Sequence, residues 1–350
     1  MTTNKSLSRF EQVDKEYEYN LIESSQDDFD DSFELQLLDV SDLEGGDASR
    51  ARFVDSFGSA MEEVGFALLV NHGLDLSLLR SVESVALELF TSTPDEEKLK
   101  FLATKCAWGG ALRRGYFPIL ESTSMQPNAL EAWEFCREDF RLSSDSNQRL
   151  SPSWPNDRLE RSLRPYWQGC ESLVLPLMRS ILEYLDADPS LYDAELSPPN
   201  GLLRLNHYPP VIETAETTAS RFMAHEDYGL FTLLPANTIE GLQIFHPQRK
   251  AWSRLRPPEG SIIVNAGDWL KLLSNNRLHS CTHRVAVPQD PAQRSRSRIS
   301  TPYVVLPHES STLEVLPGLT PKYQPVSAMD FMTGLAGKIV KYDSERLTTS

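Results

Sequence analysis

Between residues 201 and 307 the chain breaks into short runs of apolar and β-branched residues, and this pattern constrains the fold more than any other feature. The runs are LLRLNHYPP, GLFTLLPA, GLQIFHP, SIIVNAGD, HRVAVP and RISTPYVVLP, and Pro, Gly or Asn separates them. Several short strands at close spacing are typical of a barrel or of two sheets packed as a jelly roll. We therefore expect a β core over this part of the chain.

The segments outside this core carry helical patterns. Apolar residues recur at helical spacing in four stretches, which are 49–64, 76–105, 159–187 and about 327–341. The second stretch has a break near Thr93-Pro94. Two apolar runs, 33–43 and 65–73, indicate a strand entering a turn and a buried strand. Helices therefore precede and follow the β core.

The whole chain predicts an α+β fold in which N-terminal helices and a C-terminal helix flank a jelly-roll core. We expect four parts: a flexible acidic tail at 1–34, an N-terminal α/β region packed on the core at 35–195, the core at 196–310, and a C-terminal helical segment and tail at 311–350. Four aspartates between 27 and 31 make the tail acidic, and such segments often stay mobile.

Composition excludes several classes of partner. A formal net charge of −16 argues against nucleic acid and against anionic membranes. No apolar run reaches the roughly 18–20 residues that span a bilayer, and the first residues lack the apolar region of a secretory signal. The four cysteines, at 106, 136, 170 and 281, are scattered as expected for reduced thiols. The sequence thus predicts a cytoplasmic protein with a small-molecule partner and leaves the oligomeric state open.

Three residues have the side-chain types of a metal site. His225-Glu226-Asp227 is followed, after 55 intervening residues, by His283. In a strand, side chains alternate between faces, so His225 and Asp227 point the same way and Glu226 points away. Two imidazoles and one carboxylate form the facial triad that holds non-haem Fe(II) with open coordination positions.

Interpretations without an iron site also remain open for these residues. A His-x-Asp pair alone occurs by chance in many proteins. His279 and His283 have the spacing of a helical zinc pair, but the His-Glu-x-x-His pattern is absent and the following residues, Val285–Pro288, look like a strand. We expect the other histidines, at 72, 246, 279 and 308, to be structural or superficial.

A candidate anion-binding pair follows 15 residues after His283. Arg298 and Ser300 alternate onto one face of a strand, and a buried arginine with a nearby hydroxyl suits a carboxylate. Tyr208, in the run Asn206-His207-Tyr208-Pro209-Pro210, is a further donor. Arg296 is a rival of Arg298. Arg294, Arg296 and Arg298 alternate with serines, and without the metal motif a solvated loop would be the favoured interpretation of all three.

These elements together resemble the isopenicillin N synthase-like family of iron(II)- and 2-oxoglutarate-dependent dioxygenases. The resemblance runs, in order, through LQLLDVSDL, EEVGFALLVNHGL, RLNHYPP, HEDYGLFTLL, EGLQIF, GSIIVNAGDWL, SNNRLHSCTHRV and RIS. It implies a double-stranded β-helix core, iron ligands at His225, Asp227 and His283, and cosubstrate binding by Arg298, Ser300, Tyr208 and Asn206. One departure is that the gap between His283 and Arg298 is about five residues longer than is usual in the family.

The resemblance further implies an activity. The protein would use Fe(II), 2-oxoglutarate and O2 to hydroxylate, desaturate or cyclise a small organic molecule, as in secondary metabolism, and would release succinate and CO2. Candidate pocket residues flank the iron ligands, lie in the glycine-rich segment 106–120, which we expect to be a loop beside the site, or lie near the C-terminus. They are Arg113, Tyr116, Phe117, Phe222, Met223, Tyr228, Phe331 and Met332. Ordinary core packing is the competing interpretation for each of them.

Three other functions remain compatible with parts of the pattern. An oxidase of the same fold would use no 2-oxoglutarate and would bind the carboxylate of its substrate with Arg298 and Ser300. A non-catalytic binding protein would retain the fold but not the iron. A zinc hydrolase is disfavoured because no general base accompanies the three ligands.

Overall fold

The computed structural model describes residues 23–107, 112–119, 130–141, 153–211, 220–246 and 248–333. Most of its strands form two facing sheets. The large sheet has the strand order β1-β2-β11-β8-β14-β6-β5-β4-β3, with β13 also paired to β6, and the small sheet has the order β10-β9-β12-β7. Two sheets built from strands that alternate along the chain are the architecture of a jelly roll. The predicted fold class is therefore confirmed.

The bounds of the strands show how the two sheets are built. The large sheet contains β1 (Leu37–Asp39), β2 (Phe66–Val70), β3 (Thr104–Ala107), β4 (Leu112–Phe117), β5 (Glu131–Cys136), β6 (Asn200–Tyr208), β8 (Phe231–Pro235), β11 (Ile262–Ala266), β13 (Arg298–Ser300) and β14 (Tyr303–Leu306). The small sheet contains β7 (Ser220–His225), β9 (Leu242–His246), β10 (Ala251–Arg254) and β12 (His283–Ala286). A short hairpin joins β15 (Thr312–Leu313) to β16 (Val326–Ser327).

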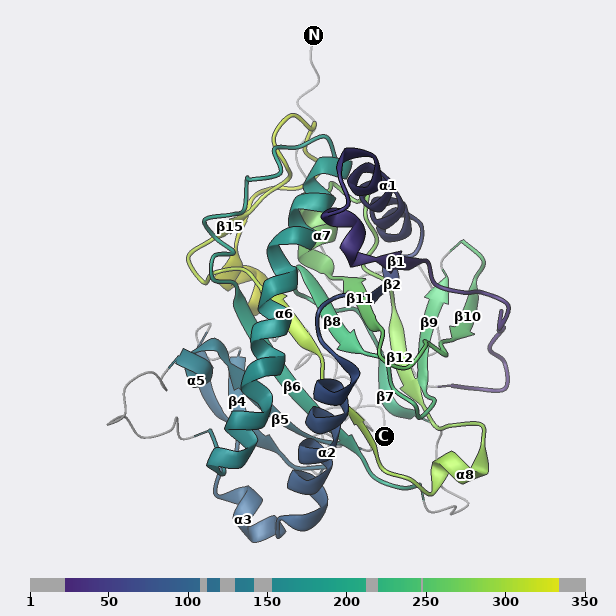
Figure 1. The fold of residues 1–350 in the computed structure, drawn as a ribbon, viewed down its shortest axis with the longest axis vertical. Helices are drawn as coiled ribbons and strands as arrows, with labels where there is room; N and C mark the ends of the chain where they lie inside the picture. Colours follow the sequence, from purple (N-terminus) through teal and green to yellow (C-terminus); the bar gives the residue numbers. More distant parts are fainter. Residues whose placement is uncertain are drawn as a thin grey trace, which may run out of the picture.

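Helices cover the large sheet and leave the small sheet on the other side of the molecule (Figure 1). The long helices are α1 (Asp47–Glu63), α2 (Leu76–Ser92) and α6 (Asp157–Tyr184). The shorter ones are η1 (Val40–Leu43), α3 (Asp95–Leu99), α5 (Arg137–Arg141), α7 (Asp268–Leu273) and α8 (Pro291–Arg294). Helix α6 packs against both α1 and α2, and its apolar side chains join the main core beneath the large sheet. This packing buries one face of the large sheet beneath the helices.

Local chemistry explains where the helices begin and end. The Asp75 side chain accepts a hydrogen bond from the Leu78 N–H and caps α2, and Asn156 caps α6 in the same way. Thr93 is extended (φ −88°, ψ 123°) because it precedes a proline, so the predicted break near Thr93-Pro94 is confirmed. Residues 328–333 begin the predicted C-terminal helix, and the rest of that prediction lies outside the described residues.

The prediction of a loop at 106–120 is wrong for the described residues there. Strand β4 pairs with β3 on one side and with β5 on the other, so Arg113, Tyr116 and Phe117 lie in a sheet. Gly115 has φ +109°, and a Cβ atom there would collide with the carbonyl oxygen of Phe101. The glycine is thus required by a close backbone approach within a sheet, which sequence analysis cannot distinguish from a loop.

The prediction of a mobile tail at 1–34 also needs correction. Residues 1–22 lie outside the described residues, but residues 23–34 pack against the small sheet. The Asp30 N–H donates to the Trp252 carbonyl, and the Trp252 N–H donates to the Asp28 carbonyl, both at 2.8 Å. The segment therefore continues the small sheet beyond β10. Its aspartates pair with arginines of that sheet and of the turn between β9 and β10.

Candidate active site

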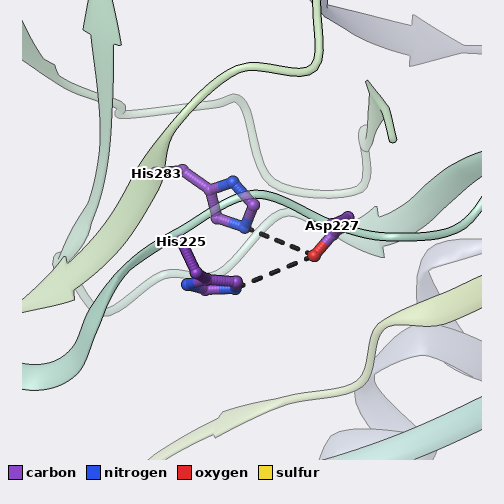
Figure 2. A group of neighbouring side chains, drawn as sticks. All are labelled: His225, Asp227 and His283. Carbon is purple, nitrogen blue, oxygen red and sulfur yellow. Dashed lines mark ion pairs between the residues drawn. The ribbon is translucent and has the colours of Figure 1, made fainter. Parts of the chain in front are cut away.

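The three predicted metal ligands meet at one end of the two sheets. His225 is the last residue of β7, His283 is the first residue of β12, and the two are direct partners in the register. Asp227 lies two residues beyond His225, in the turn that leads to β8. Figure 2 shows both imidazole rings directed at one oxygen of Asp227. The Nε2 atoms of His225 and His283 lie 3.7 and 3.8 Å from Asp227 Oδ1.

The remaining polar atoms of these side chains are held by neighbours. His225 Nδ1 lies 2.8 Å from the Met223 carbonyl oxygen, and His283 Nδ1 lies 3.1 Å from the Cys281 carbonyl oxygen. A carbonyl can only accept, so each Nδ1 carries the proton and each Nε2 lone pair is free to bind a metal. Such contacts orient metal ligands in many proteins.

Asp227 is oriented by two donors. Thr232 Oγ1 donates to Asp227 Oδ2 at 2.5 Å, and Asn265 Nδ2 donates to the same oxygen at 2.8 Å. Oδ1 is left to face the two histidines. The ligand atoms of the three residues all lie within 4.8 Å of one another, which is the spacing that a single ion requires. The donor set of two imidazoles and one carboxylate fits Fe(II).

The ionisation of His225 and Asp227 also suits a cation. Burial, and next the charge of His283, lowers the pKa of His225 to about 4, so the imidazole is neutral near pH 7. Burial alone would raise the pKa of Asp227, but His283, His225 and the hydrogen bonds from Thr232 and Asn265 bring it below its ordinary value. Neutral imidazoles beside an ionised carboxylate are the forms that bind metal.

Glu226 points away from the ligands, as predicted. Its carboxylate accepts a hydrogen bond from Thr282 Oγ1, outside the group that converges on Asp227. The helical zinc alternative is wrong, because His283 begins strand β12 and His279 precedes that strand outside any helix. Among the other histidines, His246 is buried against Phe33 and His72 is bonded to the Gly260 carbonyl, so both are structural.

The anion-binding pair is assembled by the pairing of β13 with β6. Arg298 lies opposite Tyr208 in the register, and Ser300 lies opposite Asn206. Arg298 is 2% exposed, and its Nη1 has no hydrogen-bond partner among the described residues. Asn206 Nδ2 lies 3.4 Å from Ser300 Oγ. A buried guanidinium with a free donor and a neighbouring hydroxyl has the chemistry that suits a carboxylate.

The two preceding arginines lie elsewhere. Arg296 is exposed, and Arg294 donates to the Pro288 carbonyl oxygen at the end of α8. The extra residues between His283 and Arg298 form this short helix, with Asp290 as its cap and Pro291 as its first residue. The longer connection therefore leaves Arg298 at the start of β13, facing β6.

Only some of the predicted pocket residues lie beside this site. Phe117 and Phe222 pack on a small apolar cluster that contains Tyr208 and Val285, and the Phe222 ring lies 4.3 Å from that of His225. The Arg113 guanidinium lies 5.1 Å from the Phe117 ring and donates to the Ala103 carbonyl oxygen. Phe222 thus contacts the ring of a candidate metal ligand, and Phe117 and Arg113 extend from the same apolar cluster.

The other predicted pocket residues belong mainly to the core. Tyr116 is buried and donates to Glu131 Oε2 at 2.5 Å, on the opposite face of the sheet from Phe117. Phe331 and Met332 are part of the main core, and the buried Met223 contributes its carbonyl oxygen to His225. Tyr228 is half-buried, and burial, then the charges of Glu134 and Asp227, raises the pKa of its hydroxyl.

Sequence analysis missed three charged residues around the site. Arg204 shares the face of β6 with Asn206, to which its Nε donates at 2.8 Å, and it forms an ion pair with Glu134 on β5. Arg221, on β7, is 1% exposed. A signal was present, because Arg221 and Arg204 are charged residues inside runs that otherwise predict buried strands, and buried charges need a reason.

These features define a non-haem iron oxygenase that uses an organic acid. Comparison with known proteins gives the family. The model of the 2OG-Fe(II) oxygenase superfamily matches residues 199–307, and that of the non-haem dioxygenase in morphine synthesis N-terminal region matches residues 35–157. The chain belongs to the 2OG-Fe(II) oxygenase superfamily, and it is a 2-oxoglutarate-dependent dioxygenase with Fe(II), 2-oxoglutarate and O2 as cofactor and cosubstrates.

Individual relatives agree with this assignment. Feruloyl CoA ortho-hydroxylase 2 of Arabidopsis thaliana is 30% identical over 313 residues, which cover 88% of this chain and 80% of that protein. A bi-functional coumaroyl CoA and feruloyl CoA ortho-hydroxylase of Ipomoea batatas is 29% identical over 308 residues, covering 86% and 79%. The crystal structure of a full-length Neurospora crassa protein in complex with alpha-KG and thymine has a TM-score of 0.74 at 25% identity, covering 87% of this chain and 97% of that one. This class displaces the binding-protein and zinc-hydrolase alternatives.

A search of the described helices for a candidate membrane span found none that combines the necessary length and apolar character.

Proposed function

We propose that His225, Asp227 and His283 bind the Fe(II) of this dioxygenase and that the protein hydroxylates a small organic molecule. The convergence of His225 Nε2, His283 Nε2 and Asp227 Oδ1 carries the proposal, since every other polar atom of the three side chains already has a partner. When bound, iron and 2-oxoglutarate supply the oxidising chemistry. The chain supplies the ligands, orients the cosubstrate and excludes water.

Arg298, Ser300, Tyr208 and Asn206 hold the distal carboxylate of 2-oxoglutarate in this proposal. The support is that Arg298 is buried with a free Nη1 donor, and that Ser300, Asn206 and Tyr208 adjoin it through the pairing of β13 with β6. An arginine fork binds a carboxylate in a fixed orientation, which would place the other end of the acid toward the iron ligands.

The substrate lies, we propose, against the apolar cluster around Phe117 and Phe222 and the charged pair Arg204–Glu134. Glu134 lies opposite Arg204 in the register, and the Arg204 guanidinium lies 5.2 Å from the Phe117 ring. Rings beside a cation and a carboxylate fit a molecule with one apolar part and one hydrogen-bonding part. Hydroxylation is favoured over desaturation or cyclisation because relatives at 29–30% identity are named hydroxylases.

Anaerobic titration of the apo-protein with Fe(II) and then 2-oxoglutarate tests the cofactor assignments. We expect a weak visible charge-transfer band only when both are present. It should be absent in His225→Ala and weakened in Arg298→Ala, and Arg296→Ala, an exposed arginine two residues away, should match the wild type. Iron binding without a band would favour the oxidase that lacks 2-oxoglutarate, and failure to bind iron would refute the ligand assignment.

Succinate release in the presence of candidate substrates tests the reaction. We expect release to depend on added 2-oxoglutarate and to rise with molecules that combine an aromatic ring and a polar group. Phe117→Ala should raise KM for such a substrate more than it lowers kcat, because Phe117 contacts no iron ligand in the proposal. An unchanged KM would remove Phe117 from the substrate site.

A further inference from the structure

Arg221 is a buried cation without a partner in the described part of the chain. It lies on β7, four residues before the proposed iron ligand His225, and is 1% exposed. Its Nε and Nη1 have no hydrogen-bond partner there, and Nη2 makes one long contact of 3.4 Å with the Pro209 carbonyl oxygen. Among the described residues, no carboxylate forms an ion pair with Arg221. Arginine side chains are almost never fully buried unless they are paired.

The chain brings the buried Arg298 to the same place. Arg221 Nη2 contacts the carbonyl oxygen of Pro209, and Tyr208, the residue before Pro209, lies opposite Arg298 in the pairing of β6 with β13. Burial, and next the positive charge of Arg298, lowers the pKa of Arg221 to about 10, and Tyr208 is the third group that affects it. Burial lowers the pKa of Arg298, whereas Tyr208 and then Glu83 act in the opposite direction. Glu83, on α2, is half-buried and forms no ion pair with either arginine, and burial raises the pKa of its carboxyl. Within the described residues, no carboxylate therefore forms an ion pair with either guanidinium, and Glu83 acts on Arg298 only from a distance.

Two buried like charges destabilise a fold unless an anion joins them. Burying one charged group away from water is unfavourable by several kcal/mol. Removing one partner of a buried ion pair destabilises a protein by a similar free energy. The free donors are Arg221 Nε, Arg221 Nη1 and Arg298 Nη1. The Arg298 guanidinium lies 5.1 Å from the Tyr208 ring, and Arg221 contacts the next residue, Pro209. Three N–H donors from two strands suit an anion with several acceptor oxygens, and a carboxylate has two.

We propose that Arg221 is a second positioning residue of the cosubstrate site, which binds the distal carboxylate of 2-oxoglutarate together with Arg298. The inference rests on the proposed function of Arg298 and adds a cation from the small sheet to a site otherwise built on the large sheet. Because Arg221 and His225 belong to the same strand, this carboxylate would connect the strand of an iron ligand to the opposite sheet.

Equilibrium binding separates this role from a structural one. Calorimetry on Mn(II)-loaded protein without O2 would compare 2-oxoglutarate with 2-oxopentanoate, which has the same chain length but no distal carboxylate. We expect Arg221→Met to lose about 10- to 100-fold in affinity for 2-oxoglutarate, as for a charged hydrogen bond, and to bind 2-oxopentanoate as the wild type does. Arg221→Lys should recover part of the loss, and the exposed Arg296→Met should lose nothing.

Thermal unfolding of the ligand-free variants provides a second readout. Removing an unpaired buried charge should leave the Tm of Arg221→Met equal to or above that of the wild type. Saturating 2-oxoglutarate should then raise the Tm of the wild type more than that of the variant. A lower Tm without ligand would assign Arg221 to the fold and overturn the proposal.

The remaining outcomes are also decisive. Equal loss of affinity for both acids, or no loss for either, would show that Arg221 does not contact the distal carboxylate and would overturn the inference while leaving the proposed function intact. Failure of the wild-type protein to bind 2-oxoglutarate would overturn both.

Discussion

Asp27 and Arg284 form a buried ion pair that joins the N-terminal segment to the strand carrying His283. Asp27 Oδ2 lies 2.7 Å from Arg284 Nη2, and their side chains are 3% and 0% exposed. Arg284 directly follows His283 in β12, so its side chain leaves the opposite face of the sheet, where it lies 3.7 Å from the Trp252 ring. The pair therefore supports the small sheet from behind the proposed metal site.

Asp27→Asn should destabilise the protein by about 3–5 kcal/mol, because it leaves the Arg284 charge buried without its carboxylate. Chemical denaturation measures the loss. Asp31→Asn is the matched control: Asp31 pairs with Arg254 but is 48% exposed, so its loss should stay below about 1 kcal/mol. Equal effects of the two substitutions would show that residues 23–34 contribute only superficial contacts.

Thr232→Val should weaken Fe(II) binding by about 10- to 100-fold without unfolding the protein, because valine keeps the shape of threonine but no longer donates to Asp227 Oδ2. Anaerobic competition with a metal-binding dye measures the affinity. Thr333→Val, which removes a hydroxyl from the C-terminal helix, should leave it unchanged. Wild-type affinity in Thr232→Val would mean that Asn265 alone orients the carboxylate.

Gly267→Ala should lower both stability and iron affinity. A Cβ atom at Gly267 would collide with the Gly229 carbonyl oxygen and lie 2.9 Å from that of Asp227, so the turn that carries Asp227 has to move. We expect a loss of about 1–3 kcal/mol, typical of overpacking, together with weaker Fe(II) binding. At Gly58, in the helical layer, a Cβ atom would collide with the Tyr184 ring. Gly58→Ala should therefore lower stability but leave the affinity for Fe(II) unchanged.

Glu131→Gln should make stability less dependent on pH in acid. Burial alone would raise the pKa of Glu131, but hydrogen bonds with His207, Lys98 and Tyr116 bring it below 4.5. The carboxylate therefore contributes stability above pH 4.5 and loses this contribution as the pH falls below that value. We expect the variant to be about 3 kcal/mol less stable at pH 7, with a gap that narrows below pH 4.5 in urea titrations. A gap independent of pH would contradict this account.

The features of the site that the sequence predicted follow from the alternation of side chains along a strand. Strand alternation placed His225 and Asp227 on one side and Glu226 on the other, and it placed Arg298 and Ser300 together. The same alternation was overlooked at Tyr116, which is adjacent to Phe117 and therefore faces the core with Glu131. Gly115 contributed to the wrong prediction of a loop at 106–120. A glycine in a loop and a glycine next to a close backbone segment cannot be distinguished in a sequence.

By itself, the sequence determined the class of this protein: the order of short strands, the His-x-Asp and distant histidine, and the arginine with serine two residues on. These are local spacings, and backbone geometry converts them directly into faces of strands. Only the tertiary structure decided that Asp27 meets Arg284, that Thr232 and Asn265 orient Asp227, and that Arg221 is buried without an ion-pair partner among the described residues. Such contacts depend on the register between strands far apart in the chain, and the packing of the two sheets sets that register.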